Sequence, residues 1–316
     1  MSRVDILLAT YNGARFVREQ LASISAQTHS DWHLMVRDDG SSDDTLAIVR
    51  KWAASVAQPV TIVEDGESGL GASLNFARLL ERSDAPYFAC CDQDDVWLPQ
   101  KLETMLAPVQ QAEAGSDAAR PVLGFCDLFV VDEQLNPIAP SYWRLSNLDP
   151  DRDTKRLADI MVRNVVTGCA TLGNRALREA ALPIPAGARM HDWWLAMPSR
   201  TLGPLVPVRE SLIQSRQHGS NTIGANKSTS PALVKRFFEG PTLAWGRTIR
   251  ALENSQNQAG AFVERFGSHL GPSDLAILSG YADLPQHGFA ARKRFLWRHQ
   301  IGRHQPLFRL AFLAAG

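Results

Sequence analysis

Apolar positions in the first third of the chain follow two alternating spacings. Short continuous apolar runs predict buried strands, and between them apolar residues recur every three or four positions, which predicts helices. The four predicted strands cover residues 4–9, 33–36, 60–63 and 86–91. Strands that alternate with helices of this length indicate an α/β fold with a doubly wound, mostly parallel sheet.

The pattern changes in the second half of the chain. Apolar runs at 122–131 and 165–172 predict two further strands, and the polar stretch 142–156 predicts a loop insertion. After residue 226 the strand pattern ends and apolar residues recur at helical spacing. We therefore expect an α/β domain over residues 1–225 and a helical C-terminal extension over residues 226–316.

The composition is that of an ordinary globular protein. Of the 316 residues 45% are hydrophobic, which suffices for a core, and 33 basic residues balance 33 acidic ones. A neutral chain argues against a dedicated nucleic-acid-binding protein. The first residues enter a predicted strand without a signal segment, and apolar runs stay shorter than the roughly 18 residues of a membrane span. These features predict a cytoplasmic protein.

The four cysteines carry no sign of a zinc site. Cys90, Cys91, Cys126 and Cys169 lie in apolar runs without paired C-x-x-C spacing. We expect them to be reduced and to pack as small core residues.

Three carboxylates crowd into four positions directly after the predicted strand 86–91. They belong to Asp92, Asp94 and Asp95. Such a cluster repels itself unless a cation neutralises it, and Mg²⁺ or Mn²⁺ prefers oxygen ligands and usually also holds substrate phosphates. The alternative is a solvated acidic turn.

Polar residues also follow the first two predicted strands. Thr10, Tyr11 and Asn12 come after the first, and Asp38 and Asp39 come after the second. The carboxyl ends of parallel strands share one edge of a sheet, where open α/β sheets bind ligands. We therefore expect these turns and the acidic cluster to line one crevice, with the alternative that residues 38–42 serve only as a turn and helix cap.

Five motifs in this order resemble glycosyltransferase family 2. They are ATYNG at 9–13, DDGSSD at 38–43, DQDDVW at 92–97, MHDWW at 190–194 and RQHGSN at 216–221. The resemblance extends over residues 4–224, and the last two motifs are most similar to the rhamnosyltransferase branch of bacterial surface polysaccharide synthesis. It implies a sheet of the glycosyltransferase A type, a nucleotide-diphosphate sugar as donor and inversion at the anomeric carbon.

The resemblance implies a donor-binding role for several residues. Asp38 or Asp39 would contact the nucleobase, and Asp92 would approach the ribose. The other expected donor contacts are Thr10, Tyr11, Asn12, Asn75 and Arg216, the last facing the diphosphate. We expect Asn75 there because it lies in the first turn of a helix, whose free N–H groups favour phosphate.

The expected metal ligands are Asp94 with Asp95 beside it, and His218 falls where some relatives supply a further ligand. A lone histidine is more often a satisfied core or surface residue.

Asp192 is the candidate general base, because a carboxylate within hydrogen-bond reach can take the proton of an acceptor hydroxyl. Trp193 and Trp194 would suit the apolar face of a sugar ring. The alternatives are a helix start followed by aromatic core, or a surface ion pair of Asp192 with Arg189.

These expectations converge on a metal-dependent inverting glycosyltransferase. It would move a sugar, with rhamnose as the candidate, from a dTDP- or UDP-linked donor to a hydroxyl of a glycan or lipid-linked acceptor. One alternative is a non-catalytic nucleotide-sugar-binding protein. The other is a nucleotidyltransferase, which usually has a glycine-rich basic loop where this chain has Thr10-Tyr11-Asn12-Gly13.

The C-terminal residues mix basic and aromatic side chains without an acid after Asp283. Residues 292–316 are therefore expected to make peripheral contact with the inner face of the cell membrane. The alternatives are a helix packed on the catalytic domain or a homodimer contact.

Overall fold

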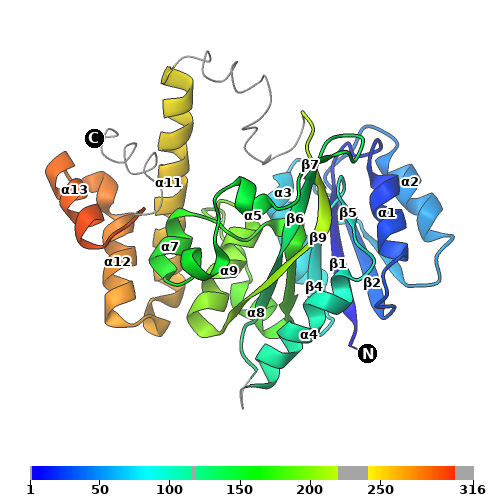
Figure 1. Ribbon diagram of the computed structural model, residues 1–316, viewed down its shortest axis with the longest axis horizontal. Helices are drawn as coiled ribbons and strands as arrows, with labels where there is room; N and C mark the ends of the chain where they lie inside the picture. Colours follow the sequence, from blue (N-terminus) through cyan, green and yellow to red (C-terminus); the bar gives the residue numbers. More distant parts are fainter. Residues whose placement is uncertain (1, 116–118, 220–240, 303–316) are drawn as a thin grey trace. The chain divides into compact units, whose positions relative to one another are not determined.

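A computed structural model describes residues 2–115, 119–219 and 241–302 of the chain (Figure 1). Its residues form two compact units, each described below by itself. The first comprises residues 1–150, 166–184 and 190–225, and the second comprises residues 151–165, 185–189 and 226–316. This division differs from the expected boundary at residue 226 because two short earlier segments belong with the C-terminal helices.

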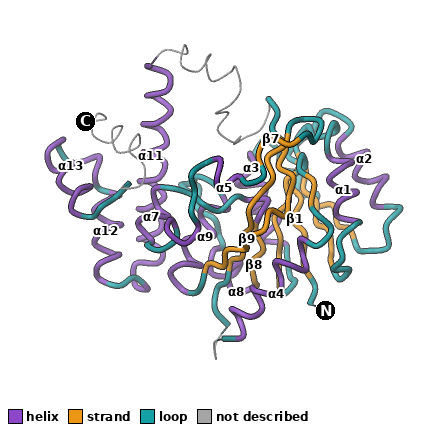
Figure 2. The backbone as a smooth tube through the Cα atoms, viewed as in Figure 1, coloured by secondary structure: helices purple, strands orange, loops and turns teal. Residues whose placement is uncertain are grey.

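The first unit is built on one sheet. Its strands are β1 (Val4–Thr10), β2 (Trp32–Asp38), β3 (Val60–Val63), β4 (Tyr87–Asp92), β5 (Val96–Trp97), β6 (Leu123–Val131), β7 (Pro137–Ala139), β8 (Thr171–Asn174) and β9 (Leu205–Arg216). Their order is β3-β2-β1-β4-β8-β6-β9-β5, with β7 paired to β6 (Figure 2). β1, β2, β3, β4, β6 and β9 run in one direction, and β5, β7 and β8 run against them. This arrangement confirms the predicted mostly parallel α/β sheet.

Helices cover both faces of this sheet. They are α1 (Val17–Ser25), α2 (Thr45–Ala53), α3 (Gly71–Arg82), α4 (Lys101–Ala114), α5 (Tyr142–Leu145), α8 (Arg175–Ala181) and α9 (His191–Leu202). Alternate β1 residues Val4, Ile6 and Leu8 share a core with apolar residues of α1, α2 and α4, because successive strand side chains point to opposite faces. α3 packs on β1 and β2, and α9 packs on α3, β6 and β9.

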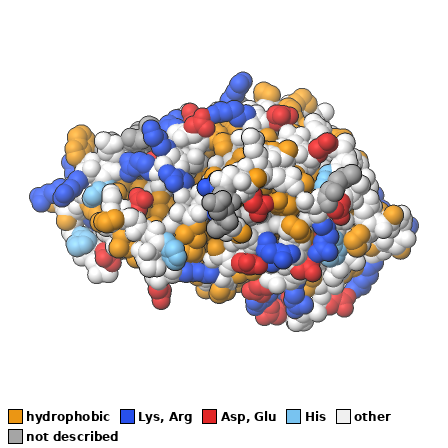
Figure 3. All heavy atoms as spheres, turned by 90° about the horizontal axis from the view of Figure 1, so that it is seen from below, with side chains coloured by type: hydrophobic (Ala, Val, Ile, Leu, Met, Phe, Trp, Pro, Cys, Tyr) orange, Lys and Arg blue, Asp and Glu red, His pale blue; other side chains and the backbone are white. Residues whose placement is uncertain are grey.

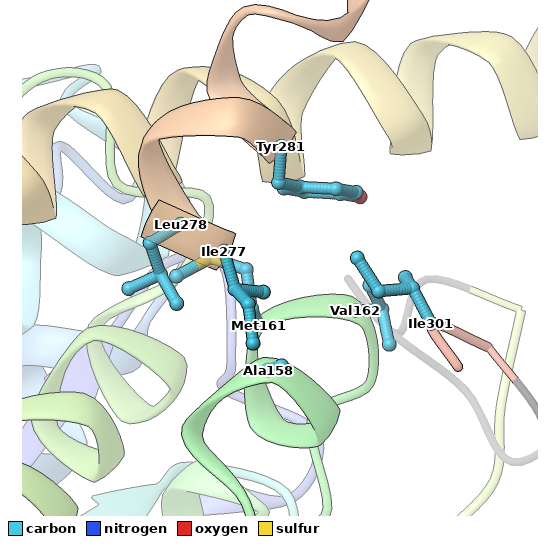
Figure 4. A pocket seen from close by; sticks show the side chains of 7 residues that line it. All are labelled: Ala158, Met161, Val162, Ile277, Leu278, Tyr281 and Ile301. Carbon is cyan, nitrogen blue, oxygen red and sulfur yellow. The ribbon is translucent and has the colours of Figure 1, made fainter. Parts of the chain in front are cut away.

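The second unit is helical. Its helices are α7 (Leu157–Val162), α11 (Pro241–Phe266), α12 (Pro272–Ala282) and α13 (Phe289–Arg298), and α6 (Pro150–Asp153) begins at its border. Side chains of α7 and α12 meet Ile301 around a small apolar hollow, and Tyr281 closes one side of it (Figure 4). Within the described parts of the chain, no helix combines the length and apolar character needed to cross a bilayer.

Three local predictions were wrong in detail. The apolar run 165–172 is not one strand: a 3₁₀ turn (Gly168–Ala170) precedes β8, and the Thr171 hydroxyl donates to the Gly168 carbonyl at 2.8 Å. The expected loop 142–156 contains the short helices α5 and α6. The long strand β9 was not predicted, because polar residues such as Arg209 and Glu210 interrupt its apolar pattern.

Candidate active site

Three turns meet at the carboxyl edge of the sheet, as the sequence predicts. Thr10 at the end of β1 pairs with Asp38 at the end of β2, and Ala9 pairs with Asp92 at the end of β4. The register therefore places the turns after β1, β2 and β4 side by side. In sheets of this kind, this edge is where ligands bind.

The turn after β1 is held to the turn after β2 by hydrogen bonds. Asn12 adopts a positive φ of 47°, which asparagine tolerates better than most residues. Its side-chain oxygen accepts from the Ser42 backbone amide at 2.8 Å, and its backbone amide donates to the Ser41 hydroxyl at 2.7 Å. Asn12, expected to contact the donor, is thus engaged in shaping the edge.

Gln93 links the turn after β1 to the turn after β4, which carries Asp92, Asp94 and Asp95 and is called the acidic turn below. Its side chain accepts from the Tyr11 amide at 2.9 Å and donates to the Tyr11 carbonyl at 2.8 Å. A Cβ at Gly13 would lie 2.1 Å from Gln93 Oε1, so a larger residue there would displace the Gln93 side chain. The two bonds leave the Tyr11 ring 56% exposed at the edge, where it is available to a ligand. In the sequence, Gln93 is only one position of the motif at 92–97, and its partner lies 82 positions away, so this role was not predicted.

Asp38 and Asp39 point in different directions. Asp38 is half-buried, and its carboxylate accepts from the Thr10 hydroxyl and the Ser41 amide, both at 2.7 Å. Asp39 is buried and accepts from the backbone amides of Leu70 at 2.9 Å and Gly71 at 2.8 Å. Asp39 therefore anchors the start of α3, which leaves Asp38 as the aspartate nearer to the open edge.

Asn75 lies beneath this edge rather than on it. The side chain is buried, its oxygen accepts from Arg37 at 3.0 Å, and its amide nitrogen donates to the Thr10 carbonyl at 3.4 Å. Arg37 is itself buried and is held by Asp65. Asn75 was predicted to contact the donor, but in the structure its side chain supports the turn after β1.

Two carboxyl groups of the acidic turn have raised pKa values. Burial, together with the charge of Asp94, raises the pKa of Asp95 to about 7. Burial also raises the pKa of Asp92, and the charges of Asp94, Asp95 and Asp192 add to that effect. Carboxylates perturbed in this way are a feature of functional sites.

Asp94 and His218 meet across this turn. His218 Nε2 lies 2.7 Å from Asp94 Oδ2, although 124 positions separate them in the chain. The imidazole ring also packs against Phe16, with ring centroids 4.8 Å apart. The fold therefore brings two of the three predicted metal ligands into direct contact.

Arg216 is hydrogen-bonded to the acidic turn and supports it. Its guanidinium is buried and donates to the Asp94 carbonyl at 2.9 Å, to the Glu133 carbonyl and to Glu19. Its backbone amide donates to Asp95 Oδ1 at 3.1 Å. The expectation that Arg216 faces a diphosphate does not fit this burial, and the residue instead positions Asp94 and Asp95.

The residues at this edge fit a hard divalent cation. Among the described residues, the ligand atoms of Asp92, Asp95 and Cys169 lie within 4.8 Å of one another. Burial raises the pKa of the Cys169 thiol, so a protonated sulfur faces the acids and oxygen atoms supply the ligands. Aspartate oxygens with one imidazole suit Mn²⁺ or Mg²⁺ better than a soft metal.

A buried lysine lies below the acids, which the sequence analysis missed. Lys101 has no exposed surface, and its Nζ lies 3.2 Å from the Trp97 ring centroid without a hydrogen-bond partner among the described residues. Burial lowers its pKa, and its charge opposes the rise in the pKa of Asp92. A lysine that begins a helix is normally read as a surface residue, so the sequence offers no signal for it.

Asp192 is brought to the same edge. It lies in the first turn of α9 and is 6% exposed. A Cβ at Gly168 would lie 3.7 Å from its Cβ, and the next residue, Cys169, touches the acidic turn. His191 beside it stacks on Phe76 with centroids 4.0 Å apart, and burial lowers the pKa of His191 to about 3. Asp192 is therefore both a helix-start residue and a neighbour of the acids.

The mostly parallel sheet, with its acidic turns at one edge, matches the fold of solved glycosyltransferases of the A type. Residues 5–179, more than half of the chain, match the family described as Glycosyl transferase family 2. The chain belongs to this family, as the motifs indicate.

Two curated relatives show how far the likeness extends. The uncharacterized glycosyltransferase RP339 of Rickettsia prowazekii is 26% identical over 225 residues, which cover 69% of this chain and 65% of that protein. The dTDP-rhamnosyl transferase RfbG of Shigella flexneri is 34% identical over 102 residues, covering 31% of this chain and 35% of that protein. The chain thus spans less than two thirds of the length of either relative.

A solved structure supports the fold assignment. It is the mannosyltransferase PcManGT of Pyrobaculum calidifontis in complex with GDP-Man and Mn²⁺. At 16% identity it matches with a TM-score of 0.56, over 99% of this chain and 85% of that one. A likeness at this level concerns the fold.

Proposed function

We propose that this protein is a metal-dependent inverting glycosyltransferase that moves a sugar from a nucleoside diphosphate to an acceptor hydroxyl. The observation that carries the proposal is the cluster at the sheet edge, where Asp92, Asp94 and Asp95 lie beside His218 and Asp192. Family membership and the complex of PcManGT with GDP-Man and Mn²⁺ support the same reading.

The donor nucleotide would lie over the turns after β1 and β2. The exposed Tyr11 ring offers a face for the base, and the half-buried Asp38 offers an acceptor for its edge. Asp92, half-exposed at the end of β4, is placed to approach the ribose. Asn12, Asp39, Asn75 and Gln93 hold these turns in place through the bonds described above.

Asp94 and His218 would hold Mg²⁺ or Mn²⁺, with Asp95 behind them. A bound divalent ion supplies charge stabilisation to the departing diphosphate. Arg216 fixes the backbone of the turn through Asp94 and Asp95, so the ligands are oriented before the ion arrives.

Asp192 would act as the base. The acceptor oxygen forms a bond to the anomeric carbon while the bond to the diphosphate oxygen breaks. The hydroxyl proton passes to the Asp192 carboxylate, and the bonding electrons leave with the nucleoside diphosphate. One displacement of this kind inverts the configuration at the anomeric carbon.

The finer assignment concerns donor and acceptor. The 34% identity to a dTDP-rhamnosyl transferase over 102 residues makes dTDP-rhamnose the first donor to test, with UDP- and GDP-sugars next. As the acceptor we propose a glycan or lipid-linked hydroxyl of surface polysaccharide synthesis, which the motifs at 190–194 and 216–221 suggest.

The test is a donor panel with Mn²⁺, with and without lipid-linked or soluble acceptors, monitored for released nucleoside diphosphate and for glycosylated product. The proposal expects acceptor-dependent release with one sugar nucleotide, abolished by chelator. Donor binding without turnover under all conditions would favour a non-catalytic binding protein. Formation of pyrophosphate from a nucleoside triphosphate and a sugar phosphate would favour a nucleotidyltransferase.

A further inference from the structure

Helix α13 of the second unit has one side already packed against protein. Leu296 is 2% exposed, and a Cβ at Gly280 of α12 would lie 2.4 Å from the Phe295 ring. The Arg292 guanidinium donates to the His287 carbonyl at 2.6 Å and the Pro285 carbonyl at 2.9 Å. This side of α13 is therefore packed against the rest of the second unit.

A neighbouring side of α13 nevertheless exposes large aromatic rings. Trp297 is 72% exposed, the most of any large hydrophobic residue in the described parts of the chain, and Phe289 is 47% exposed. Phe289, Lys293 and Trp297 are spaced four residues apart, which places them on one face of the helix. An exposed tryptophan of this degree is costly in water and is typical of an interaction surface.

Basic side chains surround these rings. Lys293, Arg294 and Arg298 are exposed, and residues 284–302 contain neither Asp nor Glu. On the face of the molecule seen in Figure 3, basic and acidic side chains are interspersed. The α13 surface thus differs in charge from a chain whose net charge is zero.

We propose that this outward face of α13, formed by Phe289, Lys293, Arg294, Trp297 and Arg298, docks on an anionic lipid membrane. Tryptophan and phenylalanine lie at the level of the lipid headgroups, and lysine and arginine are attracted to anionic lipids. A protein partner would require a complementary acidic and apolar surface. An anionic membrane offers negative charge and an apolar interior over a large area, and a short helix is enough to bind it.

Docking of this kind is reversible. Each Lys or Arg near an anionic surface strengthens partitioning by about five-fold, so three basic residues and two rings give peripheral binding that salt weakens. Membrane binding requires neither donor nor metal, so it can be tested independently of the proposed transfer reaction.

The test is co-sedimentation of the full chain with vesicles of phosphatidylglycerol or of phosphatidylcholine, at low and high salt. We expect binding to the anionic vesicles at low salt, loss at high salt and little binding to the zwitterionic vesicles. The double variant Lys293→Glu/Arg294→Glu should weaken partitioning by at least about thirty-fold, because two basic contributions are removed and reversed. Trp297→Ser should weaken it by about ten-fold or more, through loss of ring insertion.

The matched control is Arg50→Glu/Lys51→Glu on α2. These two residues are also adjacent, exposed and basic, and the ion pair of Arg50 with Glu64 at 2.7 Å is exposed enough to contribute little stability. The control should bind vesicles like the wild type. Circular dichroism melts check folding of each variant, and Trp297→Ser tests the surface alone if the double variant does not fold.

Three results would overturn the proposal. The first is full-length protein that ignores anionic vesicles at low salt. The second is equal loss of binding in the α13 and α2 charge variants, which would indicate a general charge effect. The third is a dimer that Trp297→Ser dissociates while vesicle binding is unchanged, which would assign the face to a second copy of the chain.

Discussion

Carboxyl groups near the two ends of strand β1 have pKa values shifted in opposite directions. At its amino end, Asp5 has no exposed surface, yet it accepts from Ser83 Oγ at 2.7 Å and from the Asp84 and Ala85 amides, each at 3.1 Å. Burial opposes its ionisation, but these bonds and His33 outweigh it and lower the pKa of Asp5 to about 2.

The acids beside the carboxyl end of β1 lack comparable compensation. Burial and the charge of Asp94 raise the pKa of Asp95 to about 7, and the pKa of Asp92 is raised for similar reasons. The same fold thus lowers the pKa of one buried carboxyl group at the amino end of β1 and raises the pKa of two others near its carboxyl end. The difference indicates that Asp5 serves folding, and it supports the proposal that the acidic turn holds a cation that arrives with the donor.

The largest effect is expected from Asp94→Asn. Removing this charge takes away the proposed metal ligand that contacts His218 and should cost several kcal/mol of transition-state stabilisation. Turnover of the donor identified by the panel and metal-dependent nucleotide binding should both be lost, while the thermal melt stays near that of the wild type.

The matched control for this variant is Asp44→Asn, an exposed aspartate without a capping bond at the start of α2. It should retain both activities. Full turnover by Asp94→Asn in the presence of chelator would contradict a metal role for this residue.

Asp192→Asn should have the next largest effect. The amide keeps the shape of the side chain but cannot take a proton, so transfer should fall by roughly 10²–10⁴-fold while donor affinity is retained. Measuring donor binding by calorimetry and transfer by product formation separates the two. Transfer near the wild-type rate would make Asp192 a structural residue at the start of α9.

Asp5→Asn tests the other end of β1 and should affect stability alone. A pKa lowered from 3.8 to about 2 corresponds to about 2.5 kcal/mol of folding free energy at neutral pH. Because the folded-state pKa is lowered, this contribution is present above about pH 4 and is lost as the pH falls from about 4 to about 2. Donor binding and turnover should be unchanged in folded protein.

The measurement is denaturant unfolding of wild type and Asp5→Asn across that pH range. The difference between them should narrow below about pH 4. A difference that does not change with pH would mean that the hydrogen bonds of Asp5 do not depend on its charge.

Periodicity and turn chemistry were sufficient to predict the sheet edge. The apolar runs that form β1, β2 and β4 are short and continuous, and a parallel sheet then brings their ends together. The run 165–172 misled because buried residues outside a strand look the same in sequence as residues within one. Strand β9 was not predicted because exposed and half-buried polar positions interrupt its apolar pattern.

The supporting residues of the site could not be predicted, because their partners are distant in sequence. Arg216 reaches Glu19 from 197 positions away, so its burial depends on the completed fold. Lys101 belongs to a helix with an ordinary apolar face, and its lack of exposure follows from the packing of α4 on β6, β8 and β9. The C-terminal prediction for residues 292–316 lies partly outside the described residues, and only α13 carries it here.

The most direct test of the contrast between the two ends of β1 is the number of protons released when Mn²⁺ binds. Because the pKa of Asp95 is raised to about 7, this carboxyl is partly protonated at about pH 6, and burial raises the pKa of Asp92 as well, so we expect a cation at this edge to displace protons. Titration calorimetry in buffers of different ionisation enthalpy should give release of about one proton per ion, reduced in Asp95→Asn and unchanged in Asp5→Asn. Mn²⁺ binding without proton release, or no Mn²⁺ binding even with the donor nucleotide present, would contradict the assignment of the acidic turn as the metal site.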